Sequence, residues 1–381
     1  MKKILKVFVV IFGIFILLVI LAWPMAPVWA KLGAKPICIS GSFPHIKIVD
    51  CPDKNSSSPQ VTPVTLTSIK AESPVPIIVD DDGSPDGTIA LLYFLSNPLF
   101  EVKAVTISNG EAHPAIFAEH IAWMLAGFGK GDIPIGAGRG NPLEGNNAFP
   151  DEWRQVSDNF WGMQPPQAAD PKQPSPAAQL IVDVVTRSDQ PVRIFVSGTH
   201  TNLAEALRLD PSLKAKIKDI YIMGGSVYKP GNIKSDYPAI DNEVAEWNIW
   251  VDPVAAQEVF ASGLDLHLTP LDATQQVIWQ QADADRWAKA TSPEGKLADN
   301  LLQWMLDSWS KKGVFIWDLV AAVNATDAAF CPPISLALDV VTQPGKEKGR
   351  TVVTNGTANT TVCLEPEAGQ IKAYVESIFT K

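Results

Sequence analysis

The sequence has little positive charge and few histidines or cysteines, and these shortages exclude several kinds of chemistry. Its 381 residues include 31 Lys and Arg, 41 Asp and Glu, five His and four Cys, with a net charge of −10. No nucleic-acid partner is expected, because phosphate contacts need clustered Lys and Arg and no basic stripe lies beyond the extreme N-terminus. The cysteines show no CxxC motif and no zinc-like Cys/His spacing. Neither a Gly-x-Ser-x-Gly elbow nor a phosphate-binding glycine loop is present.

The N-terminus carries a targeting signal. Lys2, Lys3 and Lys6 precede an almost unbroken apolar run, Val7–Trp23. This run is long for the core of a signal peptide and short for a membrane span. Lysines on the cytoplasmic side and a translocated body follow the positive-inside rule. Residues 1–30 are therefore predicted to be an uncut membrane anchor, which is favoured, or a cleaved signal peptide. The rest of the chain is expected to be extracytoplasmic, at the cell membrane if uncut and secreted or periplasmic if cleaved.

Export explains the use of cysteine. Four cysteines allow three pairings, and the sequence alone does not choose among them. In an oxidising compartment the local pairs are expected, Cys38 with Cys51 and Cys331 with Cys363. Free buried thiols are the alternative.

Beyond the N-terminal segment, the composition of the chain changes at about residue 75. Residues 31–74 are predicted to be an extracytoplasmic linker, since Pro52–Pro74 is rich in Ser, Pro, Thr and Lys without an apolar period. Over residues 75–381, short apolar runs alternate with amphipathic stretches, which predicts one α/β domain with a mostly parallel sheet flanked by helices. The polar segment 146–175 is predicted to be a long loop. The candidate strands are Val75–Asp80, Val102–Ser108, Val192–Ser197, Ile220–Met223 and Leu264–Leu268, and the candidate helices are Gly87–Leu95, Pro114–Leu125, Ala177–Thr186 and Asn202–Leu209.

The segment after the first of these strands is strongly acidic. Val75–Val79 is apolar, and the turn Asp80–Gly87 that follows contains four Asp before a helical pattern begins. In open α/β sheets, ligands bind beyond the carboxyl ends of the strands. Clustered carboxylates repel one another unless a cation or strong donors lie among them, and carboxylate oxygens suit Ca²⁺ or Mg²⁺. The alternative is a turn that only caps the next helix, with Asp86 as the N-cap residue.

The stretch Asp80–Leu92 resembles the signature of the nucleoside hydrolases, the inosine-uridine preferring superfamily, in which an Asp-x-Asp loop follows the first strand. Gly83 and the Trp317–Asp318 pair are similar to the purine-preferring (inosine-adenosine-guanosine) branch. The likeness covers about residues 75–381 and implies a Rossmann-like α/β fold. Further similar blocks follow in matching order: Val105–Asn109, Gly198–Ala204, Ile222–Gly225, Ala245–Asn248 and Ile316–Leu319.

This resemblance implies an enzyme that hydrolyses the N-glycosidic bond of purine ribonucleosides to free base and ribose with a Ca²⁺-bound water. It implies that Asp82 binds the Ca²⁺ and is the catalytic base toward that water, whose pKa the metal lowers. The backbone carbonyl of Thr201 and the carboxylate of Asp318 are the other implied ligands. Asp80 would support the loop from behind.

The resemblance also assigns the residues that contact the substrate. Binding spread over the ribose can selectively stabilise the oxocarbenium-like sugar of the transition state. Trp317 is implied to be catalytic, because an indole stacked on the base makes its ring nitrogen easier to protonate. Trp161 is predicted to stack from the other face, whereas Trp153 is expected to be a packing residue. The residues implied to hold the ribose are Asp86, Asn109, Glu246 and Asn248, with Asn232 ahead of Asn242 for one further position.

The sequence departs from the family pattern in two places: the segment 228–242 is longer than usual, and one position of the acidic turn differs. The family loop ends in two Asp, the second a Ca²⁺ ligand, and here that position is Gly87. The lost carboxylate should weaken Ca²⁺ binding unless another group fills the gap. Asp81 adds a carboxylate, but strand geometry points its side chain away from those of Asp80 and Asp82.

Two other functions are therefore kept beside the hydrolase. The first is a membrane-tethered nucleoside- or ribose-binding protein, or a degenerate hydrolase that has lost its metal site. The second is a phosphatase with an acidic nucleophile loop, which ranks last because it does not explain the later blocks. The sequence leaves open whether the chain forms a homo-oligomer.

Overall fold

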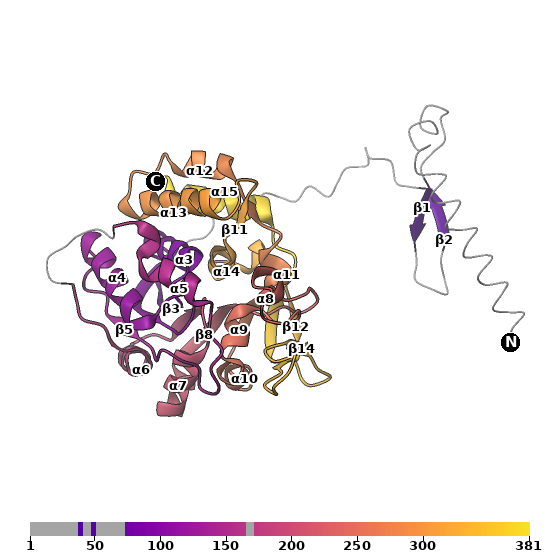
Figure 1. Cartoon of the computed structure of the whole chain (residues 1–381), viewed down its shortest axis with the longest axis horizontal. Coiled ribbons are helices and arrows are strands. Elements are labelled where there is room, and N and C mark those ends of the chain that lie inside the picture. The colour runs from indigo at the N-terminus through magenta and orange to yellow at the C-terminus, as the bar shows by residue number, and fades with distance from the viewer. Residues whose placement is uncertain (1–36, 41–46, 51–72, 165–170) are drawn as a thin grey trace, which may run out of the picture. The chain divides into compact units, whose positions relative to one another are not determined.

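The computed structural model describes residues 37–40, 47–50, 73–164 and 171–381 (Figure 1). The chain divides into two compact units, Met1–Pro63 and Val64–Lys381. In the first unit, β1 (Ile37–Ser40) and β2 (Lys47–Asp50) form an antiparallel pair within the segment predicted to be a linker. The predicted membrane segment and Cys51, the expected partner of Cys38, lie outside the described residues. Within the described ranges, no helix has the length and apolar character needed to cross a membrane.

A nine-stranded sheet forms the centre of the second unit. Its order is β12-β15-β9-β8-β7-β3-β4-β5-β6, and every neighbouring pair is parallel except β12 with β15. The predicted α/β fold with a mostly parallel sheet is confirmed. The strands are β3 (Val75–Asp81), β4 (Phe100–Ile107), β5 (Ile135–Ala137), β6 (Ser175–Pro176), β7 (Val192–Val196), β8 (Ile217–Met223), β9 (Leu266–Thr269), β12 (Pro333–Leu336) and β15 (Thr360–Cys363).

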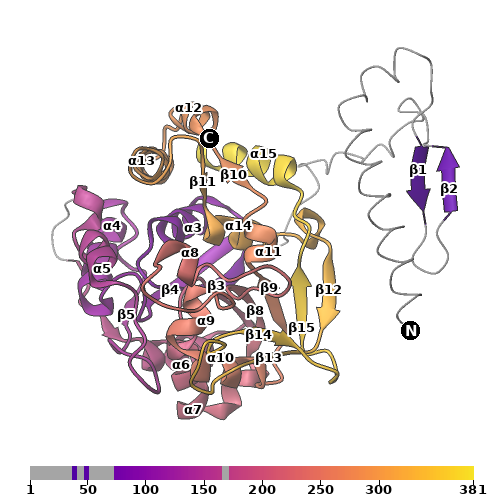
Figure 2. The same cartoon turned by 45° about the vertical axis from the view of Figure 1, so that its right-hand side comes forward.

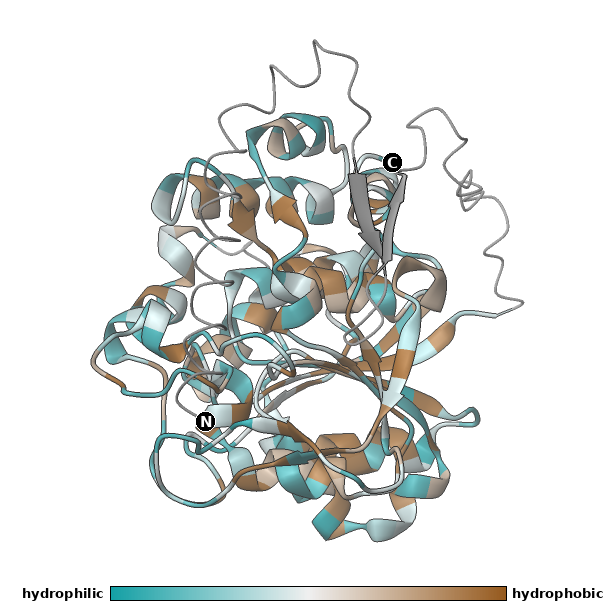
Figure 3. Cartoon of the chain, turned by 90° about the vertical axis from the view of Figure 1, so that its right-hand side faces the viewer, coloured by the Kyte–Doolittle hydropathy of each residue, from teal (hydrophilic) through white to brown (hydrophobic). Residues whose placement is uncertain are grey.

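Helices cover both faces of this sheet (Figure 2). One face carries α3 (Pro85–Ser96), α4 (Pro114–Gly127), α13 (Pro293–Ser308), α14 (Trp317–Asn324) and α15 (Ala368–Phe379), and the other carries α6 (Ala177–Arg187), α7 (Thr201–Leu209) and α10 (Pro253–Phe260). A hydrophobic core lies on each face of the sheet, and side chains of β3 point alternately into the two cores. Ile77 and Val79 pack on the first face, and Ile78 packs on the second. Because both faces are covered, the central strands are apolar along most of their length (Figure 3).

Shorter elements complete the unit, and one of them corrects a prediction. The segment 146–175 is not one long loop, because α5 and a 3₁₀ turn form within it. The helix α5 is mostly polar, so it lacks the apolar period that would have predicted it. These elements are α5 (Asp151–Asp158), α8 (Ile233–Asp236), α9 (Trp247–Val251), α11 (Leu271–Thr274), α12 (Gln281–Trp287), β10 (Ile278–Trp279) paired with β11 (Val314–Phe315), β13 (Leu338–Val340) paired with β14 (Thr351–Val353), and 3₁₀ turns at Phe160–Gly162, Pro211–Ala215 and Ala328–Phe330.

A disulfide bond joins Cys331 to Cys363, with 5.5 Å between their Cα atoms. It links the chain just before β12 to the last residue of β15, at one edge of the sheet. This predicted pairing is confirmed.

The strand order places a topological switch beside β3. The chain builds β3, β4, β5 and β6 outward in one direction and then returns to add β7, β8 and β9 on the other side of β3. In open α/β sheets this arrangement leaves a crevice at the carboxyl ends of the strands on either side of the switch, where ligands bind. Asp80 and Asp81 are the last residues of β3, so the acidic turn lies at this crevice.

Candidate active site

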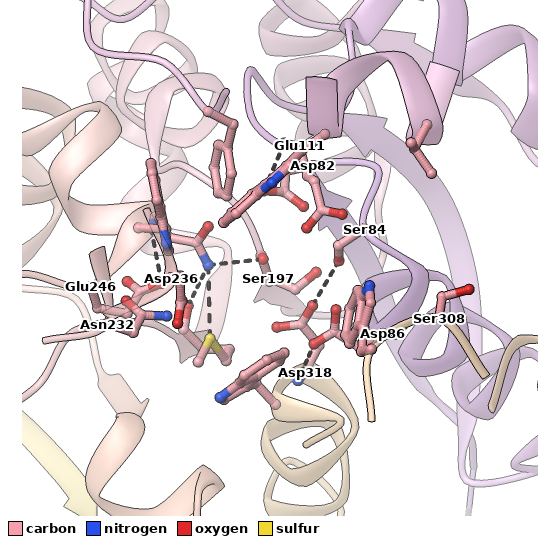
Figure 4. Close-up of a pocket in the computed structure, with 18 of the residues that line it drawn as sticks. Asp82, Ser84, Asp86, Glu111, Ser197, Asn232, Asp236, Glu246, Ser308 and Asp318 are labelled. Carbon is pink, nitrogen blue, oxygen red and sulfur yellow. Dashed lines mark hydrogen bonds between the residues drawn. The ribbon is translucent and has the colours of Figure 1, made fainter. Parts of the chain in front are cut away.

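A pocket of about 640 Å³ opens at the carboxyl ends of the central strands (Figure 4). Its size is in the range of pockets that hold small ligands. The predicted site residues that line it are Asp82, Asp86, Asn232, Glu246, Asn248, Trp317 and Asp318. We call Asp82, Asp86 and Asp318 the acidic floor. The aromatic wall consists of Phe149, Trp153, Trp247, Trp304, Trp309 and Trp317.

Asp82 fits closely between two glycines. A Cβ atom on Gly110 would overlap Asp82 Oδ2, and one on Gly198 would overlap Asp82 Cβ, so neither position accepts a side chain. The Glu111 amide donates a hydrogen bond to Asp82 Oδ2 at 3.3 Å. Burial, followed by the nearby charge of Asp81, raises the pKa of Asp82 well above its usual value. Asp82 is thus a rigidly held buried carboxyl that faces the pocket.

Two helix N-termini meet at the acidic floor. Ser84, rather than Asp86, is the N-cap of α3, because its Oγ accepts a hydrogen bond from the Gly87 amide at 2.9 Å. The same Oγ donates to Asp318 Oδ2 at 3.2 Å, and the Asp318 amide donates to Asp86 Oδ2 at 3.4 Å. The alternative in which the turn caps the helix through Asp86 is therefore wrong, and the Asp86 carboxylate faces the pocket. Burial raises the pKa of Asp86 and Asp318, while these hydrogen bonds and the positive helix ends favour ionisation.

Asp80 and Asp81 lie behind the floor and do not line the pocket. Asp80 Oδ1 accepts hydrogen bonds from Thr106 Oγ1 at 2.6 Å and from Asn202 Nδ2 at 2.8 Å. Asp81 Oδ1 accepts one from the Gly83 amide at 2.5 Å. Burial raises the pKa of each Asp to about 7, because desolvation outweighs these hydrogen bonds.

Glu246 and Asn248 are held by the backbone at the start of α9. Glu246 is the N-cap residue, and its carboxylate accepts hydrogen bonds from the amides of Asn248 and Ile249 and from the Gly225 amide. Burial nevertheless raises its pKa to about 7. Asn248 Nδ2 donates to the Ser197 carbonyl at 3.0 Å. These side chains enter the pocket in fixed orientations, which suits the recognition of hydroxyl groups.

Asn232 and Asn242, the two candidates for one ribose position, are in different environments. Asn232 lines the pocket, and its buried Oδ1 has no hydrogen-bond partner among the described residues. Asn242 is away from the pocket lining, and its Oδ1 accepts hydrogen bonds from the amides of Val244 and Ala245. The structure therefore favours Asn232 for contact with a ligand.

Three predicted site residues do not line the pocket. Asn109 is buried, and its Oδ1 accepts a hydrogen bond from Arg154 at 3.1 Å. Thr201 begins α7, and its Oγ1 donates to Asp252 Oδ2 at 2.7 Å. Trp161 packs in the hydrophobic core with a backbone φ of 53°. The roles assigned to these residues stay predictions.

Sequence reasoning missed several residues of the lining. Glu111 lies a few residues beyond β4, and Ser157 Oγ donates to it at 3.3 Å. Burial raises the pKa of Glu111 to about 8. Its place just after a strand end was a usable signal. Trp304 and Trp309, near the end of α13, gave none, because an aromatic residue in an amphipathic helix indicates core packing as readily as a site.

The chemistry of the floor and of Asp81 behind it fits a divalent cation. Asp81 Oδ2 and Asp82 Oδ1 are buried and have no hydrogen-bond partner in the described part of the chain. Buried carboxylate oxygens without partners are unfavourable unless a cation compensates them, and all-oxygen donors suit Ca²⁺. Within the described ranges, no group of three or more His, Cys, Asp or Glu side chains could by itself hold a metal ion. Backbone oxygens or water would therefore complete the coordination.

Comparisons with known proteins agree with this geometry. Residues 77–373 match the family described as inosine-uridine preferring nucleoside hydrolase. The chain is 31% identical over 301 residues to the pyrimidine-specific ribonucleoside hydrolase RihA of Klebsiella pneumoniae subsp. pneumoniae, covering 76% of this chain and 94% of that protein. It is also 31% identical over 304 residues to RihA of Enterobacter sp. (strain 638), covering 76% and 93%.

Solved structures share the fold at lower sequence identity. A plant nucleoside hydrolase superposes with a TM-score of 0.71 and 23% identity, covering 81% of this chain and 99% of that one. A purine-preferring ribonucleoside hydrolase from Gardnerella vaginalis gives 0.70 and 20%, covering 80% and 99%. With the family match extending over most of the chain, the protein belongs to the inosine-uridine preferring nucleoside hydrolases, a family of N-glycosidases.

Proposed function

We propose that this protein hydrolyses the N-glycosidic bond of purine ribonucleosides to free base and ribose, with Ca²⁺ held at the acidic floor. The observation that carries the proposal is one pocket that combines the carboxylates of Asp82, Asp86 and Asp318 with six aromatic side chains. A nucleoside has the same two parts, a polar sugar and a flat apolar base.

The acidic floor suits the chemistry at the sugar. As the bond to the base breaks, positive charge develops on the ribose, and fixed carboxylates stabilise it more strongly in the transition state than in the ground state. Asp82, with one buried oxygen left without a partner in the described part of the chain, is placed to accept the proton of the attacking water. Ca²⁺, when bound, would lower the pKa of a water molecule and orient it. Glu246 and Asn248 would hold the ribose hydroxyls from the other side of the pocket.

The aromatic wall supports the choice of a purine. Stacking against indole and phenyl rings is stronger for a two-ring base than for a one-ring base, because more flat surface is covered. Trp317 stands next to Asp318, so a base stacked on it would lie beside the acidic floor. The relatives at 31% identity are named pyrimidine-specific, so the purine preference must be tested directly against pyrimidine nucleosides.

A nucleoside panel tests the proposal. The full chain is assayed for release of reducing sugar from inosine, guanosine, adenosine, uridine and cytidine, with Ca²⁺ or with a chelator. We expect kcat/KM for purine nucleosides to exceed that for pyrimidine nucleosides by about tenfold or more. A pyrimidine preference would overturn the base assignment alone. Absence of ribose from every nucleoside at saturating Ca²⁺, with nucleoside binding retained, would overturn hydrolysis and leave a binding protein.

We also propose that the catalytic unit works outside the cytoplasmic membrane. The lysines before Val7–Trp23 and the disulfide Cys331–Cys363 support this location, since disulfides persist in oxidising compartments. Protease should digest the catalytic unit when it is added to cells that have lost their outer layers but keep an intact cytoplasmic membrane. Protection until the cytoplasmic membrane is broken would contradict this location.

A further inference from the structure

We propose that Asp81 supplies to the Ca²⁺ site the carboxylate that the family pattern places at position 87, so that Asp81 and Gly87 form one exchanged pair. This inference rests on the proposed function and on its Ca²⁺ at the acidic floor. It accounts for the way in which the acidic turn departs from the family pattern. Gly87 removes a carboxylate from the turn, and Asp81 adds one.

The position of the Asp81 side chain carries the argument. A Cβ atom built on Gly87 would lie 2.5 Å from Asp81 Oδ2, closer than two such atoms can approach. An aspartate carries its own carboxylate oxygens at a similar distance from its Cβ. The Asp81 carboxylate therefore occupies the space that the side chain of an aspartate at position 87 would fill, although it comes from β3 and not from α3.

The same space connects directly to the acidic floor. Ser84 Oγ lies 2.8 Å from the Cβ position of Gly87 and donates a hydrogen bond to Asp318 Oδ2 at 3.2 Å. Asp81 Oδ2 and Ser84 Oγ thus both lie within 3 Å of the Cβ position of Gly87, and the same serine hydroxyl contacts Asp318.

The unpartnered oxygen is the second observation. Asp81 is 1% exposed, and its Oδ1 is bound by the Gly83 amide while its Oδ2 has no partner within the described residues. A side chain that served only the turn would need just the first oxygen. The second lies beside the Cβ position of Gly87 without a partner in the described part of the chain, and a cation bound there would satisfy it.

The position of the Asp81 carboxylate in turn requires a glycine at position 87. With Asp81 present, any side chain at position 87 overlaps its carboxylate, and a second carboxylate there would also add like-charge repulsion. Exchanging both residues should restore a workable site, whereas exchanging one should not.

Calorimetric titration of Ca²⁺ into the chelator-treated full chain tests the exchange, with the Ca²⁺-induced rise of the thermal unfolding midpoint as a second readout. We expect Asp81→Asn to weaken Ca²⁺ binding by about tenfold or more, because one anionic ligand is lost. The double variant Asp81→Ala/Gly87→Asp should bind within roughly threefold of the wild type. Gly87→Asp alone should unfold at a lower temperature. Asp183→Asn, on the exposed side of α6 with Arg187 as its partner, is the charge-matched control and should bind like the wild type.

The outcomes separate this inference from the proposed function. If the wild type hydrolyses nucleosides only with Ca²⁺ while Asp81→Asn binds Ca²⁺ as tightly, the exchange is wrong and the function stands. If the wild type binds no Ca²⁺, both the exchange and the Ca²⁺-dependent reaction are wrong. Should Asp81→Asn not fold, the double variant decides, because a folded double variant without Ca²⁺ affinity would contradict the exchange.

Discussion

The acidic floor and the aromatic wall belong to one pocket but are built in different ways. The floor carboxylates lie just after β3 and at the N-termini of α3 and α14. Ser84 Oγ donates a hydrogen bond to Asp318, and the Asp318 amide donates one to Asp86. The wall is assembled from α5, α9, α13, α14 and the segment before α5, and its Trp309 is 42% exposed. The floor thus adjoins the end of a central strand, whereas the wall side chains come from helices and connecting segments outside the sheet. We infer that the floor sets the reaction and the wall sets the base preference.

The largest expected effect comes from removing the proposed base of the floor. Asp82→Ala should lower kcat by about a thousandfold, in the range that general bases contribute. Purine binding should change far less, because the wall is untouched. Single-turnover ribose release and nucleoside titration measure the two effects. If Asp82→Ala left kcat within a few-fold of the wild type, the floor would not set the reaction.

A change outside both regions should affect stability without affecting base choice. Replacing Cys331 and Cys363 by Ala should lower the free energy of unfolding by about 3 kcal/mol, since the disulfide closes a loop with a sequence separation of 32. The purine-to-pyrimidine ratio of kcat/KM should stay unchanged. Denaturant unfolding and the nucleoside panel are the measurements. A changed ratio would mean that the pocket depends on this edge of the sheet.

Substitution in the wall should change base preference more than the reaction. Trp317→Ala should lower kcat/KM for inosine by roughly tenfold, through the loss of stacking worth about 1–3 kcal/mol, and that for uridine by less. Trp309→Ala, at the exposed end of the wall, should have a smaller effect in the same direction. Equal losses for both nucleosides would refute the assignment of base choice to the wall.

The pH dependence of stability above pH 6.5 should report on the buried carboxyl groups in and around the pocket. Burial raises the pKa of Asp80, Asp81 and Glu246 to about 7 and of Glu111 to about 8. Such groups stabilise the fold fully below their unfolded pKa, and this contribution is lost as the pH rises through the folded values. Buried His200, with its pKa lowered to about 4, acts in the opposite direction but only below about 6.5.

Between pH 6.5 and 8, the chelated protein should therefore lose at least about 3 °C of unfolding midpoint. Saturating Ca²⁺ should make this loss smaller, because it favours the ionised carboxylates. Thermal unfolding across this pH range measures how the midpoint changes with pH, once with Ca²⁺ and once with chelator. A midpoint that rises with pH in chelator would contradict the assignment of buried, protonated carboxyls.

The contrast between floor and wall also explains what the sequence could predict. Asp82 was singled out because it belongs to an acidic turn directly after a predicted strand, which is a local pattern, whereas Asp318 was identified only through the resemblance to the nucleoside hydrolases. The Cys331–Cys363 pairing was predicted on the same local basis. The short strands β5 and β6 were not predicted, since runs of three and two residues show no period.

Apart from Trp317, which the family resemblance identified, the wall could not be predicted because its residues meet only through tertiary packing. Trp153 was expected to be a packing residue, and it does pack on Trp247 with ring centroids 5.3 Å apart, yet it also lines the pocket. The capping of α3 by Ser84 in place of Asp86 had a local signal. Both residue types are good N-caps, but Pro85 directly follows Ser84, and proline is common at the first helical position.

The most direct test is the Ca²⁺ dependence of ribose release from inosine by the full wild-type chain. We predict that removing Ca²⁺ with a chelator reduces release to the background rate and that adding Ca²⁺ back restores it. Ribose release that is unaffected by the chelator would contradict a reaction at a Ca²⁺-binding acidic floor.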